Sequence, residues 1–339
     1  MKRRLPFVLV FLALLLAEGV WLLADLRAAQ TETPATQRLP PAVMSDSGDA
    51  AWASSTSADG RYIAFVSSAA NLVAGDRDAS PDIFVYDRQT GVMECVSVTS
   101  DEHDLESRFD APSISDDGRY VVFEGWSYTL VPGSSGYVSE IYLHDRQTGA
   151  TTLLTTSAIA EELIDGNSFD ATISADGRYV VFASEATNLV SGDTNDAVDI
   201  FLHDVSAGGT RRVSLRGAAT QAGGDSGAPT VSADGRFVAF HSDADSLVNG
   251  DTNNQSDVFV RNVAAGTTTR VSVGAGGAQG DGPSWQGVIS DNGRYVAFES
   301  LAANFAADDD NDAGDVFIRD RQANTTALVS RDADGHPAA

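Results

Sequence analysis

Ser174-Ala175-Asp176-Gly177-Arg178-Tyr179 is one of five copies of a short motif that recurs along this chain. The copies follow one another at spacings of 58, 59, 58 and 58 residues. A repeat of this length indicates a single supersecondary unit that is copied and stacked on its neighbours. The five copies are Ser57–Tyr62, Ser115–Tyr120, Ser174–Tyr179, Ser232–Phe237 and Ser290–Tyr295.

Each copy of the motif predicts a β-hairpin. Asp-Gly or Asn-Gly between two apolar runs is a strong hairpin signal, because these residues tolerate the positive φ that a tight turn needs. The strand after the turn is apolar on both of its faces, as Arg61–Phe65 shows, so it is expected to lie between two sheets. In the third repeat we predict four strands: Ala171–Ser174, Arg178–Ser184, Asp199–Asp204 and Thr210–Leu215.

Four short strands at a period near 58 residues fit one blade of a β-propeller with an enlarged loop. We therefore predict an all-β fold over residues 45–331, a single five-bladed β-propeller of four-stranded antiparallel blades, followed by a tail at 332–339. Five complete blades in phase would let the first pack on the fifth without exchanging a strand. A solenoid is the alternative repeat architecture, but it needs polar caps at its ends, and neither end of the repeats shows one.

The pattern Ser-x-Asp-Gly-Arg-Tyr-Val-x-Phe resembles the repeats of TolB-like β-propeller proteins, and the resemblance covers nearly all of residues 45–331. It is specific because it recurs five times in phase. The resemblance implies a periplasmic or secreted scaffold that binds a protein or another ligand. We expect a monomer whose partner is a protein or a polysaccharide of the cell envelope.

The charge of the chain excludes two classes of partner. Its 48 acidic and 22 basic residues give a formal net charge of −26, and its only lysine is Lys2. Such a surface repels nucleic-acid phosphates and anionic lipid, so neither is an expected partner. It attracts a divalent cation or a basic protein instead, although acidic surfaces also serve solubility alone.

The N-terminus predicts export. Lys2, Arg3 and Arg4 precede a largely apolar stretch, so residues 1–29 read as a signal peptide or an N-terminal membrane anchor. Both interpretations place the propeller outside the cytoplasm, secreted, periplasmic or membrane-anchored, and contact with the membrane is expected only through an uncleaved N-terminal segment. Residues 30–44, rich in proline and without an apolar run, predict a linker.

The enlarged loop between the second and third strands is a candidate calcium site. Four of its copies carry oxygen ligands at positions 1, 3 and 7, which is what Ca²⁺ prefers. Asp and Asn are also good turn formers, so a purely structural role is the alternative. The second repeat lacks the pattern. The candidate ligands are Asp76, Asp78 and Asp82; Asp193, Asn195 and Asp199; Asp251, Asn253 and Asp257; and Asp309, Asn311 and Asp315.

Aromatic residues that break the repeat are candidate ligand-binding residues. Trp52 and Trp285 each lie five residues before the turn serine. If the first and fifth blades are neighbours, the two indoles are expected side by side near the channel, as a stacking platform for sugars or peptides or as packing between the blades. In the second repeat, Trp126 and Tyr128 replace small loop residues and favour recognition, or burial against the next blade.

An enzyme is the alternative function. Glu124, His241 and Glu299 stand at one repeat position that is Val66 and Ala183 elsewhere, and paired carboxylates serve glycoside hydrolases. The sequence contains no nucleophile elbow, no metal-spaced histidine cluster and no phosphate-binding loop. Binding therefore remains the leading prediction, with an extracellular glycoside hydrolase-like enzyme as the alternative.

Overall fold

The computed structural model describes residues 51–74, 80–97, 107–309, 311 and 313–337. All of these residues belong to one compact unit, Ser45–Ala339. Within the described residues, regular structure consists of strands and one turn of 3-10 helix at Ala275–Gly277, so the all-β prediction is confirmed for this part of the chain. None of the described residues forms a helix with the length and hydropathy to cross a membrane. The predicted N-terminal segment and linker lie outside the described residues.

The strands form five four-stranded antiparallel sheets and one two-stranded sheet among the described residues, and we number the larger ones sheet 1 to sheet 5 in chain order. The smaller sheet pairs β13 (Leu215–Arg216) with β14 (Thr220–Gln221). Sheet 1 contains β1 (Ala51–Thr56), β2 (Tyr62–Ser67), β3 (Asp82–Asp87) and β4 (Val92–Cys95); sheet 2 contains β5 (Arg108–Ile114), β6 (Tyr120–Trp126), β7 (Glu140–Asp145) and β8 (Ala150–Leu153); sheet 3 contains β9 (Ser168–Ile173), β10 (Tyr179–Ser184), β11 (Asp199–Asp204) and β12 (Gly209–Arg212); sheet 4 contains β15 (Ser226–Val231), β16 (Phe237–Ser242), β17 (Asp257–Asn262) and β18 (Thr267–Arg270); sheet 5 contains β19 (Ser284–Ile289), β20 (Tyr295–Ser300), β21 (Asp315–Asp320) and β22 (Thr325–Leu328).

The repeated motif closes the first hairpin of each sheet through its own side chains. In sheet 1 the Ser57 hydroxyl donates to Asp59 Oδ1 at 2.7 Å, and the Arg61 N–H donates to the same oxygen at 2.9 Å. The Tyr62 N–H donates to Ser57 Oγ at 3.0 Å, and Gly60 takes a φ of +65°. The same three bonds recur in the other four sheets, so the motif builds the turn.

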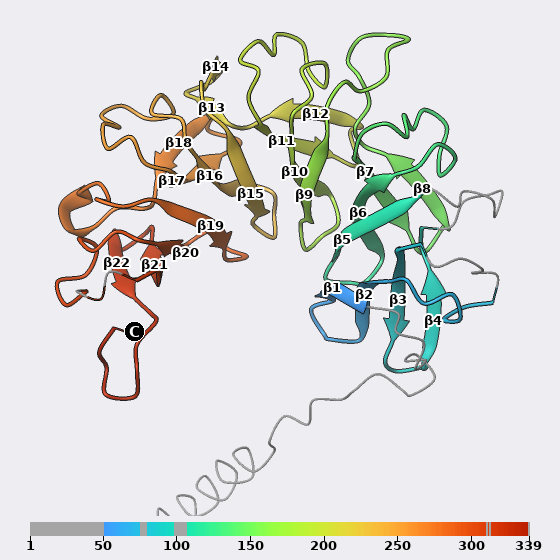
Figure 1. Ribbon diagram of the computed structural model, residues 1–339, viewed down its shortest axis with the longest axis horizontal. Coiled ribbons are helices and arrows are strands. Elements are labelled where there is room, and N and C mark those ends of the chain that lie inside the picture. The colour runs from blue at the N-terminus through green and yellow to red at the C-terminus, as the bar shows by residue number, and fades with distance from the viewer. Residues whose placement is uncertain (1–50, 75–79, 98–106, 310, 312, 338–339) are drawn as a thin grey trace, which may run out of the picture. The chain divides into compact units, whose positions relative to one another are not determined.

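Neighbouring sheets pack face to face and share the core. One face of each sheet contacts the opposite face of the next, as Val66 and Ile83 of sheet 1 do with Phe123 and Tyr142 of sheet 2. Equivalent apolar clusters lie between sheets 2 and 3, 3 and 4, and 4 and 5. Figure 1 shows the five sheets following one another around an arc, with the first strand of each on the inner side. These two-sided contacts explain why the second strands are apolar on both faces.

An aromatic ring on a glycine joins each pair of consecutive sheets. The Tyr62 ring of sheet 1 lies on Gly118 in the turn of sheet 2, where a Cβ atom would approach the ring to 2.1 Å. Tyr120, Tyr179 and Phe237 lie in the same way on the turn glycines of sheets 3, 4 and 5. The aromatic residue of the motif therefore packs against the next copy of the motif, which explains its recurrence.

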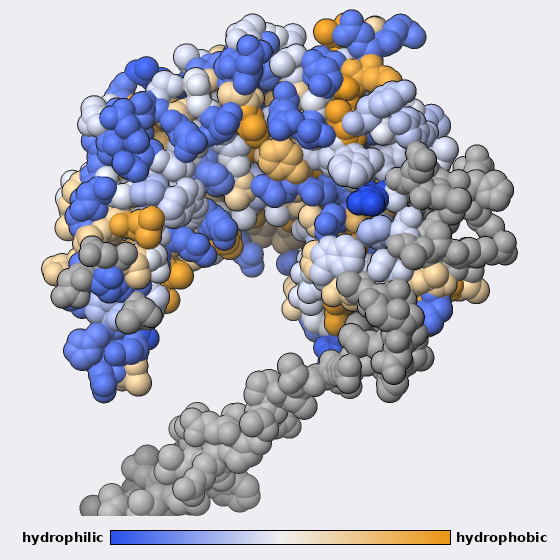
Figure 2. Space-filling view, viewed as in Figure 1, coloured by the Kyte–Doolittle hydropathy of each residue, from blue (hydrophilic) through white to orange (hydrophobic). Residues whose placement is uncertain are grey.

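Sheets 1 to 4 each pack one face against the next sheet in chain order, and we call this the forward face. The forward face of sheet 5 is partly exposed. Val316 is 37% and Val329 is 54% exposed, whereas the equivalent Val258 and Val271 of sheet 4 are buried. Figure 2 shows apolar surface at this end of the arc. The sequence therefore keeps core-type residues on a face that no described sheet covers.

The contacts that join consecutive sheets do not recur between sheet 5 and sheet 1 within the described ranges. The nearest described atom to a Cβ on Gly60, the turn glycine of sheet 1, is an Arg88 nitrogen and not the Tyr295 ring. In sheets 1 to 4 a hydroxyl residue of the first strand forms a hydrogen bond with the first strand of the next sheet, as Thr230 does when its Oγ1 accepts the Ile289 N–H at 3.1 Å. Sheet 5 carries Val288 at this position. The expected packing of the first blade on the fifth is therefore absent from these contacts.

Candidate functional site

The first strands of all five sheets line one cavity of about 750 Å³ at the inner side of the arc, which we call the axial cavity. Sheet 1 contributes Ala53–Ser55 and sheet 5 contributes Trp285–Val288, with equivalent segments from the sheets between them. Each first strand has a bulge opposite its second strand at this point. A cavity of this volume is within the range of small-molecule and oligomer sites.

A non-glycine residue with positive φ stands at each bulge. The five φ values lie between 40° and 56°, at Ala53, Ala111, Asp170, Ala228 and Gln286. Such backbone conformations cost about 1–3 kcal/mol each and persist where the surrounding structure fixes them. Because the same strain recurs in every sheet, it belongs to the repeated architecture and shapes the cavity wall.

A second hollow of about 280 Å³, which we call the tryptophan pocket, lies between sheets 1 and 2. Trp52 of β1 and Trp126 at the end of β6 line it, and both indoles are partly exposed, at 38% and 44%. Trp52 Nε1 donates to Asp110 Oδ1 at 3.1 Å. Arg108, Glu124 and Ser139 complete its polar lining. Two accessible indoles beside carboxylates and a guanidinium can hold a ring-shaped polar ligand.

Glu124 connects the tryptophan pocket with the axial cavity. It stands opposite Asp110 across β5 and β6, and its Oε2 accepts the Asp170 N–H at 2.8 Å. Burial raises the pKa of Glu124 to about 7, aided by the carboxylates of Asp170 and Asp110 and opposed by the Asp170 N–H. At neutral pH the group therefore exists in both protonation states and can either donate or accept a hydrogen bond.

His241 lines the axial cavity from sheet 4. Burial lowers its pKa, so the ring is neutral at pH 7. Its Nδ1 is buried and has no hydrogen-bond partner within the described part of the chain. Glu299, the third residue at this repeat position, stands on the exposed forward face of sheet 5 and lines neither hollow. Glu124, His241 and Glu299 therefore do not converge in one pocket.

Trp52 and Trp285 line different cavities, and no ring contact joins them within the described ranges. Both stand opposite the residue after the second-strand phenylalanine, Trp52 facing Val66 and Trp285 facing Glu299. Equivalent residues of a rotational repeat point the same way around the axis. Trp52 thus points toward sheet 2, and Trp285 points away from sheet 4. The described contacts therefore do not bring the two indoles side by side, and Trp52 shares a hollow with Trp126 instead.

Tyr128 lies beyond Trp126, in the loop that follows β6. Its ring packs edge-to-face on Tyr137 with 5.4 Å between centroids, and it also covers Gly136. Tyr128 is half exposed and Tyr137 largely exposed. The loop of sheet 2 therefore presents an aromatic pair to solvent. This pair is separate from the lining of the tryptophan pocket.

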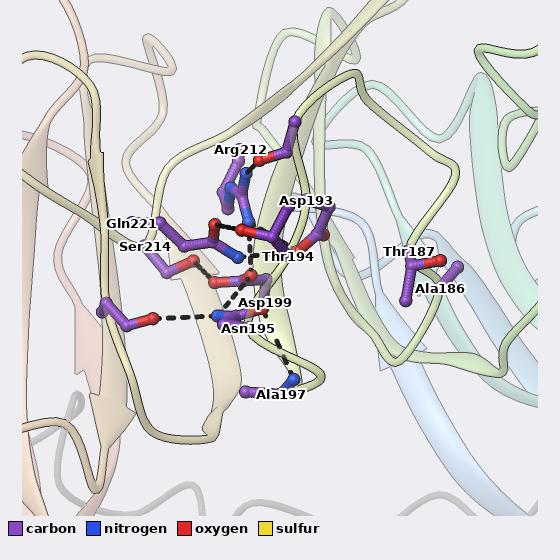
Figure 3. A network of polar contacts seen from close by, with 12 residues as sticks. Ala186, Thr187, Asp193, Thr194, Asn195, Ala197, Asp199, Arg212, Ser214 and Gln221 are labelled. Carbon is purple, nitrogen blue, oxygen red and sulfur yellow. Dashed lines mark hydrogen bonds and ion pairs between the residues drawn. The ribbon is translucent and has the colours of Figure 1, made fainter.

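The acidic loop of sheet 3 is closed around an arginine (Figure 3). Arg212 Nη1 lies 2.8 Å from both Asp193 Oδ1 and Asp199 Oδ2, and all three side chains are buried. Asn195 Nδ2 donates to Asp199 Oδ2 at 3.1 Å, and Gln221 Nε2 donates to Asp193 Oδ1 at 2.7 Å. Burial raises the pKa of Asp193 although Arg212 opposes the shift. The guanidinium thus supplies the positive charge that a cation would supply.

Sheet 4 repeats this arrangement, with Arg270 Nη1 at 2.8 Å from Asp251 and 2.9 Å from Asp257. Asn253 donates to Asp257 as Asn195 does to Asp199. The arginine position is Cys95 in sheet 1 and Leu328 in sheet 5, each opposite the same third-strand aromatic residue. The four acidic loops look alike in sequence, but those of sheets 3 and 4 face an arginine of the fourth strand and those of sheets 1 and 5 do not.

The acid at position 7 has a structural role in all four loops. A serine two residues beyond the fourth strand donates to it in each of these sheets, as Ser97 does to Asp82 at 2.7 Å and Ser330 does to Asp315. Asn311 also donates to Asp315, at 3.2 Å. Asp309 is described, whereas Asp76 and Asp78 lie outside the described residues. Within the described residues, no group of three or more His, Cys, Asp or Glu side chains is arranged to hold a metal ion.

Sequence reasoning missed Arg212, Arg270 and the carboxylate pair of Asp110 and Glu124. A signal for the arginines was present, because the fourth-strand position is arginine only in repeats three and four, which both carry acidic loops. The pair of Asp110 and Glu124 could be found only through the register of β5 and β6.

No protein-family model matches the sequence, and a search of curated proteins found no match. Solved structures do match. A putative TolB from Agrobacterium tumefaciens is 19% identical, with a TM-score of 0.50, over 83% of this chain and 80% of its own. The propeller domain of the Trilobed protease from Pyrococcus furiosus, whose description includes an open velcro topology, is 11% identical, with a TM-score of 0.52, over 84% and 73%. The fold is that of a TolB-like β-propeller.

TolB from Acinetobacter baumannii is also similar, at 18% identity and a TM-score of 0.47 over 85% of this chain. The chain spans 56% of the length of that protein. At these identities the likeness concerns the fold, and fold alone does not determine function. The function must therefore be argued from the tryptophan pocket and the axial cavity.

Proposed function

We propose that this chain is an exported five-bladed β-propeller that binds a polysaccharide of the cell envelope in the tryptophan pocket. The observation that carries the proposal is the meeting of Trp52 and Trp126 with Asp110, Arg108 and Glu124 in one hollow. None of these residues belongs to the repeated turn motif. They break the repeat, so blade architecture does not account for them.

The chemistry of the pocket suits a sugar. The C–H face of a pyranose packs on an indole, while its hydroxyl groups need donors and acceptors in the plane of the ring. Asp110 supplies an acceptor and Arg108 a donor. Glu124, with a pKa of about 7, can act as either. A volume of about 280 Å³ suits one or two sugar rings, and the polymer would continue toward the axial cavity past Glu124 and Asp170.

A hydrolase is the second candidate, and Glu124 is the specific observation that favours it. A carboxyl with a raised pKa beside a second carboxylate is the arrangement that glycoside hydrolases use. Glu124 would be the general acid and Asp110 its partner. In this case the protein would release reducing ends from envelope polysaccharide, and Glu124→Gln would stop the release while retaining binding.

Three further features belong to the proposal. The N-terminal segment 1–29 would direct export, and the exported protein would be a monomer. Calcium would stabilise only the acidic loops of sheets 1 and 5, because Arg212 and Arg270 already neutralise those of sheets 3 and 4. A protein partner of the envelope is the competing kind of ligand, as the TolB-like resemblance implies.

Co-sedimentation with purified peptidoglycan sacculi tests the proposal. We expect the wild-type protein to sediment with sacculi, and the double variant Trp52→Ala/Trp126→Ala to stay in the supernatant with an unchanged circular dichroism spectrum. Release of reducing sugar from the same sacculi distinguishes the hydrolase from the binding protein. Equal sedimentation of both proteins would place binding elsewhere, and no sedimentation of either would favour a protein partner.

A further inference from the structure

The outer strands of sheets 3 and 4 enclose a hollow of about 570 Å³ on the acidic protein, far along the chain from the tryptophan pocket. Its lining includes Arg211 on β12 and Arg261 on β17, together with Thr210, Ser191 and Arg212, whose charge is taken up by Asp193 and Asp199. No acidic residue is part of this lining. We call this hollow the arginine groove.

Arg261 is only 4% exposed, and its hydrogen bonds go to neutral acceptors. Its Nη1 donates to the carbonyl oxygens of Leu215 at 3.1 Å and Gly217 at 2.6 Å, and to Thr268 Oγ1 at 3.1 Å. Neither Arg261 nor Arg211 forms an ion pair with a carboxylate of the described residues. Burial lowers the pKa of Arg261, and the charge of Arg211 adds to the shift.

The boundary between sheets 1 and 2 is a built-in reference for this groove. There Arg146 Nε lies 2.7 Å from Glu94 Oε1, so the two charges neutralise each other. Arg211 occupies the position of Glu94, since each stands opposite the equivalent residue of the third strand, Leu202 or Val85. Val263 occupies the position of Arg146, directly after the third strand.

The boundary between sheets 3 and 4 thus carries Arg211 in place of Glu94 and Val263 in place of Arg146, and Arg261 stands where sheet 2 carries His144. The ion pair is lost, and Arg211 and Arg261 both line the hollow. Two guanidinium groups facing one hollow repel each other, and a buried charge without a counter-charge is costly. Among the described residues, arginines of every sheet form ion pairs with carboxylates, as Arg61, Arg119, Arg178 and Arg294 do. An anion between Arg211 and Arg261 would remove both costs.

We propose that the arginine groove binds an oxyanion, the phosphate or sulfate group of a small molecule or of a polymer. Arg211 and Arg261 would donate to its oxygens, with Thr210 and Ser191 as further donors. Guanidinium groups match such oxygens in geometry as well as in charge. The groove is independent of the proposed sugar site, because it shares no lining residue with the tryptophan pocket or the axial cavity.

Isothermal titration of the full-length protein with inorganic phosphate, and separately with inorganic sulfate, tests the proposal. We expect saturable binding that Arg211→Gln weakens at least tenfold. The matched control Arg236→Gln removes an exposed arginine of sheet 4 and should bind phosphate as the wild type does. Trp126→Ala should also bind phosphate normally, which separates failure here from failure of the sugar site.

The charge reversal Arg211→Glu gives a second readout that does not depend on the ligand. It places an acid where sheet 1 carries Glu94, close to the buried Arg261, and should raise the melting temperature while abolishing phosphate binding. A polymer source is distinguished from a free anion by whether dextran sulfate binds at least tenfold more tightly than inorganic sulfate. The proposal is overturned if Arg211→Gln and Arg211→Glu bind phosphate within twofold of the wild type. It is equally overturned if phosphate raises the melting temperature no more than sodium chloride of equal ionic strength.

Discussion

The acidic loop of sheet 3 and the tryptophan pocket each bring two carboxylates together, but they neutralise them differently. In the loop, Asp193 and Asp199 share one nitrogen of the buried Arg212. In the pocket, Asp110 and Glu124 face an indole N–H and a backbone N–H, and no ion pair of the described residues reaches either. The carboxylates of the loop are neutralised by the protein's own arginine, whereas those of the pocket can still accept hydrogen bonds from a ligand.

The comparison teaches where function is to be sought in a repeat protein. The ion pairs of Arg212 in sheet 3 recur with Arg270 in sheet 4, and we call each set the arginine network. In both sheets it links the enlarged loop to the fourth strand of the same sheet. The tryptophan pocket occurs once and joins two sheets. The fold accounts for the network that recurs, whereas it does not account for the tryptophan pocket, which occurs once.

The largest expected effect is on the stability of the arginine network. Arg212→Ala leaves Asp193 and Asp199 buried without a counter-charge, and breaking a buried ion pair typically costs about 3–5 kcal/mol. Urea unfolding should show a loss of that size. The control Arg236→Ala removes an exposed pair with Asp234 and should cost less than about 1 kcal/mol. A loss below 1 kcal/mol for Arg212→Ala would mean that the loop does not depend on its arginine.

The second effect is a pH dependence that Glu124 confers on stability. Its folded pKa of about 7 lies above the ordinary value of 4.5, so the folded state binds the proton more tightly than the unfolded state. The contribution of Glu124 is thus present at pH 4–5 and is lost as pH rises through about 7. In Glu124→Gln the side-chain carbonyl oxygen can still accept the Asp170 N–H, and the side chain carries no charge. The variant should therefore be more stable than the wild type at pH 8 by roughly 1–2 kcal/mol, after allowance for partial exposure.

Paired urea titrations at pH 5 and pH 8 measure this effect. The two proteins should be close in stability at pH 5 and should differ at pH 8. A constant difference between them at both pH values would show that Glu124 does not titrate with a raised pKa.

How far the sequence predicts this molecule depends on the range of the contacts involved. The hairpin turns follow from local chemistry, since all three side-chain bonds of the turn lie within residues 57–62: Ser57 donates to Asp59, and these two side chains accept the N–H groups of Tyr62 and Arg61. The third-repeat strand Asp199–Asp204 was predicted with its observed bounds, and the fourth strand ends at Arg212 rather than Leu215. The direction in which Trp52 points could not be predicted, because it depends on the packing of one sheet on another.

The acidic loops show the same limit. Their spacing suggested a cation site, but the positive charge that closes them in sheets 3 and 4 comes from an arginine 13 residues beyond Asp199 and Asp257, on the fourth strand. A pattern read within the loop alone therefore could not distinguish a metal site from an ion pair.

The smallest expected effect concerns calcium. If the loops of sheets 1 and 5 bind Ca²⁺ in the folded state only, each site adds about 0.4 kcal/mol when free calcium equals Kd. Leu328→Arg places a guanidinium where sheets 3 and 4 carry theirs and should remove the contribution of sheet 5. Differential scanning calorimetry in calcium and in chelator, at matched ionic strength, measures it. Equal melting temperatures for the wild type in the two buffers would reduce all four loops to structural turns.

The most direct test of the central claim is an isothermal titration of a soluble glycan, chitohexaose, into matched tryptophan variants. The account predicts that Trp52→Ala and Trp126→Ala each weaken binding at least tenfold, because both indoles would stack on the same sugar. Trp285→Ala, which alters the axial cavity and not the pocket, should change the affinity less than threefold. Binding that is lost in Trp285→Ala but retained in the other two variants would contradict the account and place the glycan in the axial cavity.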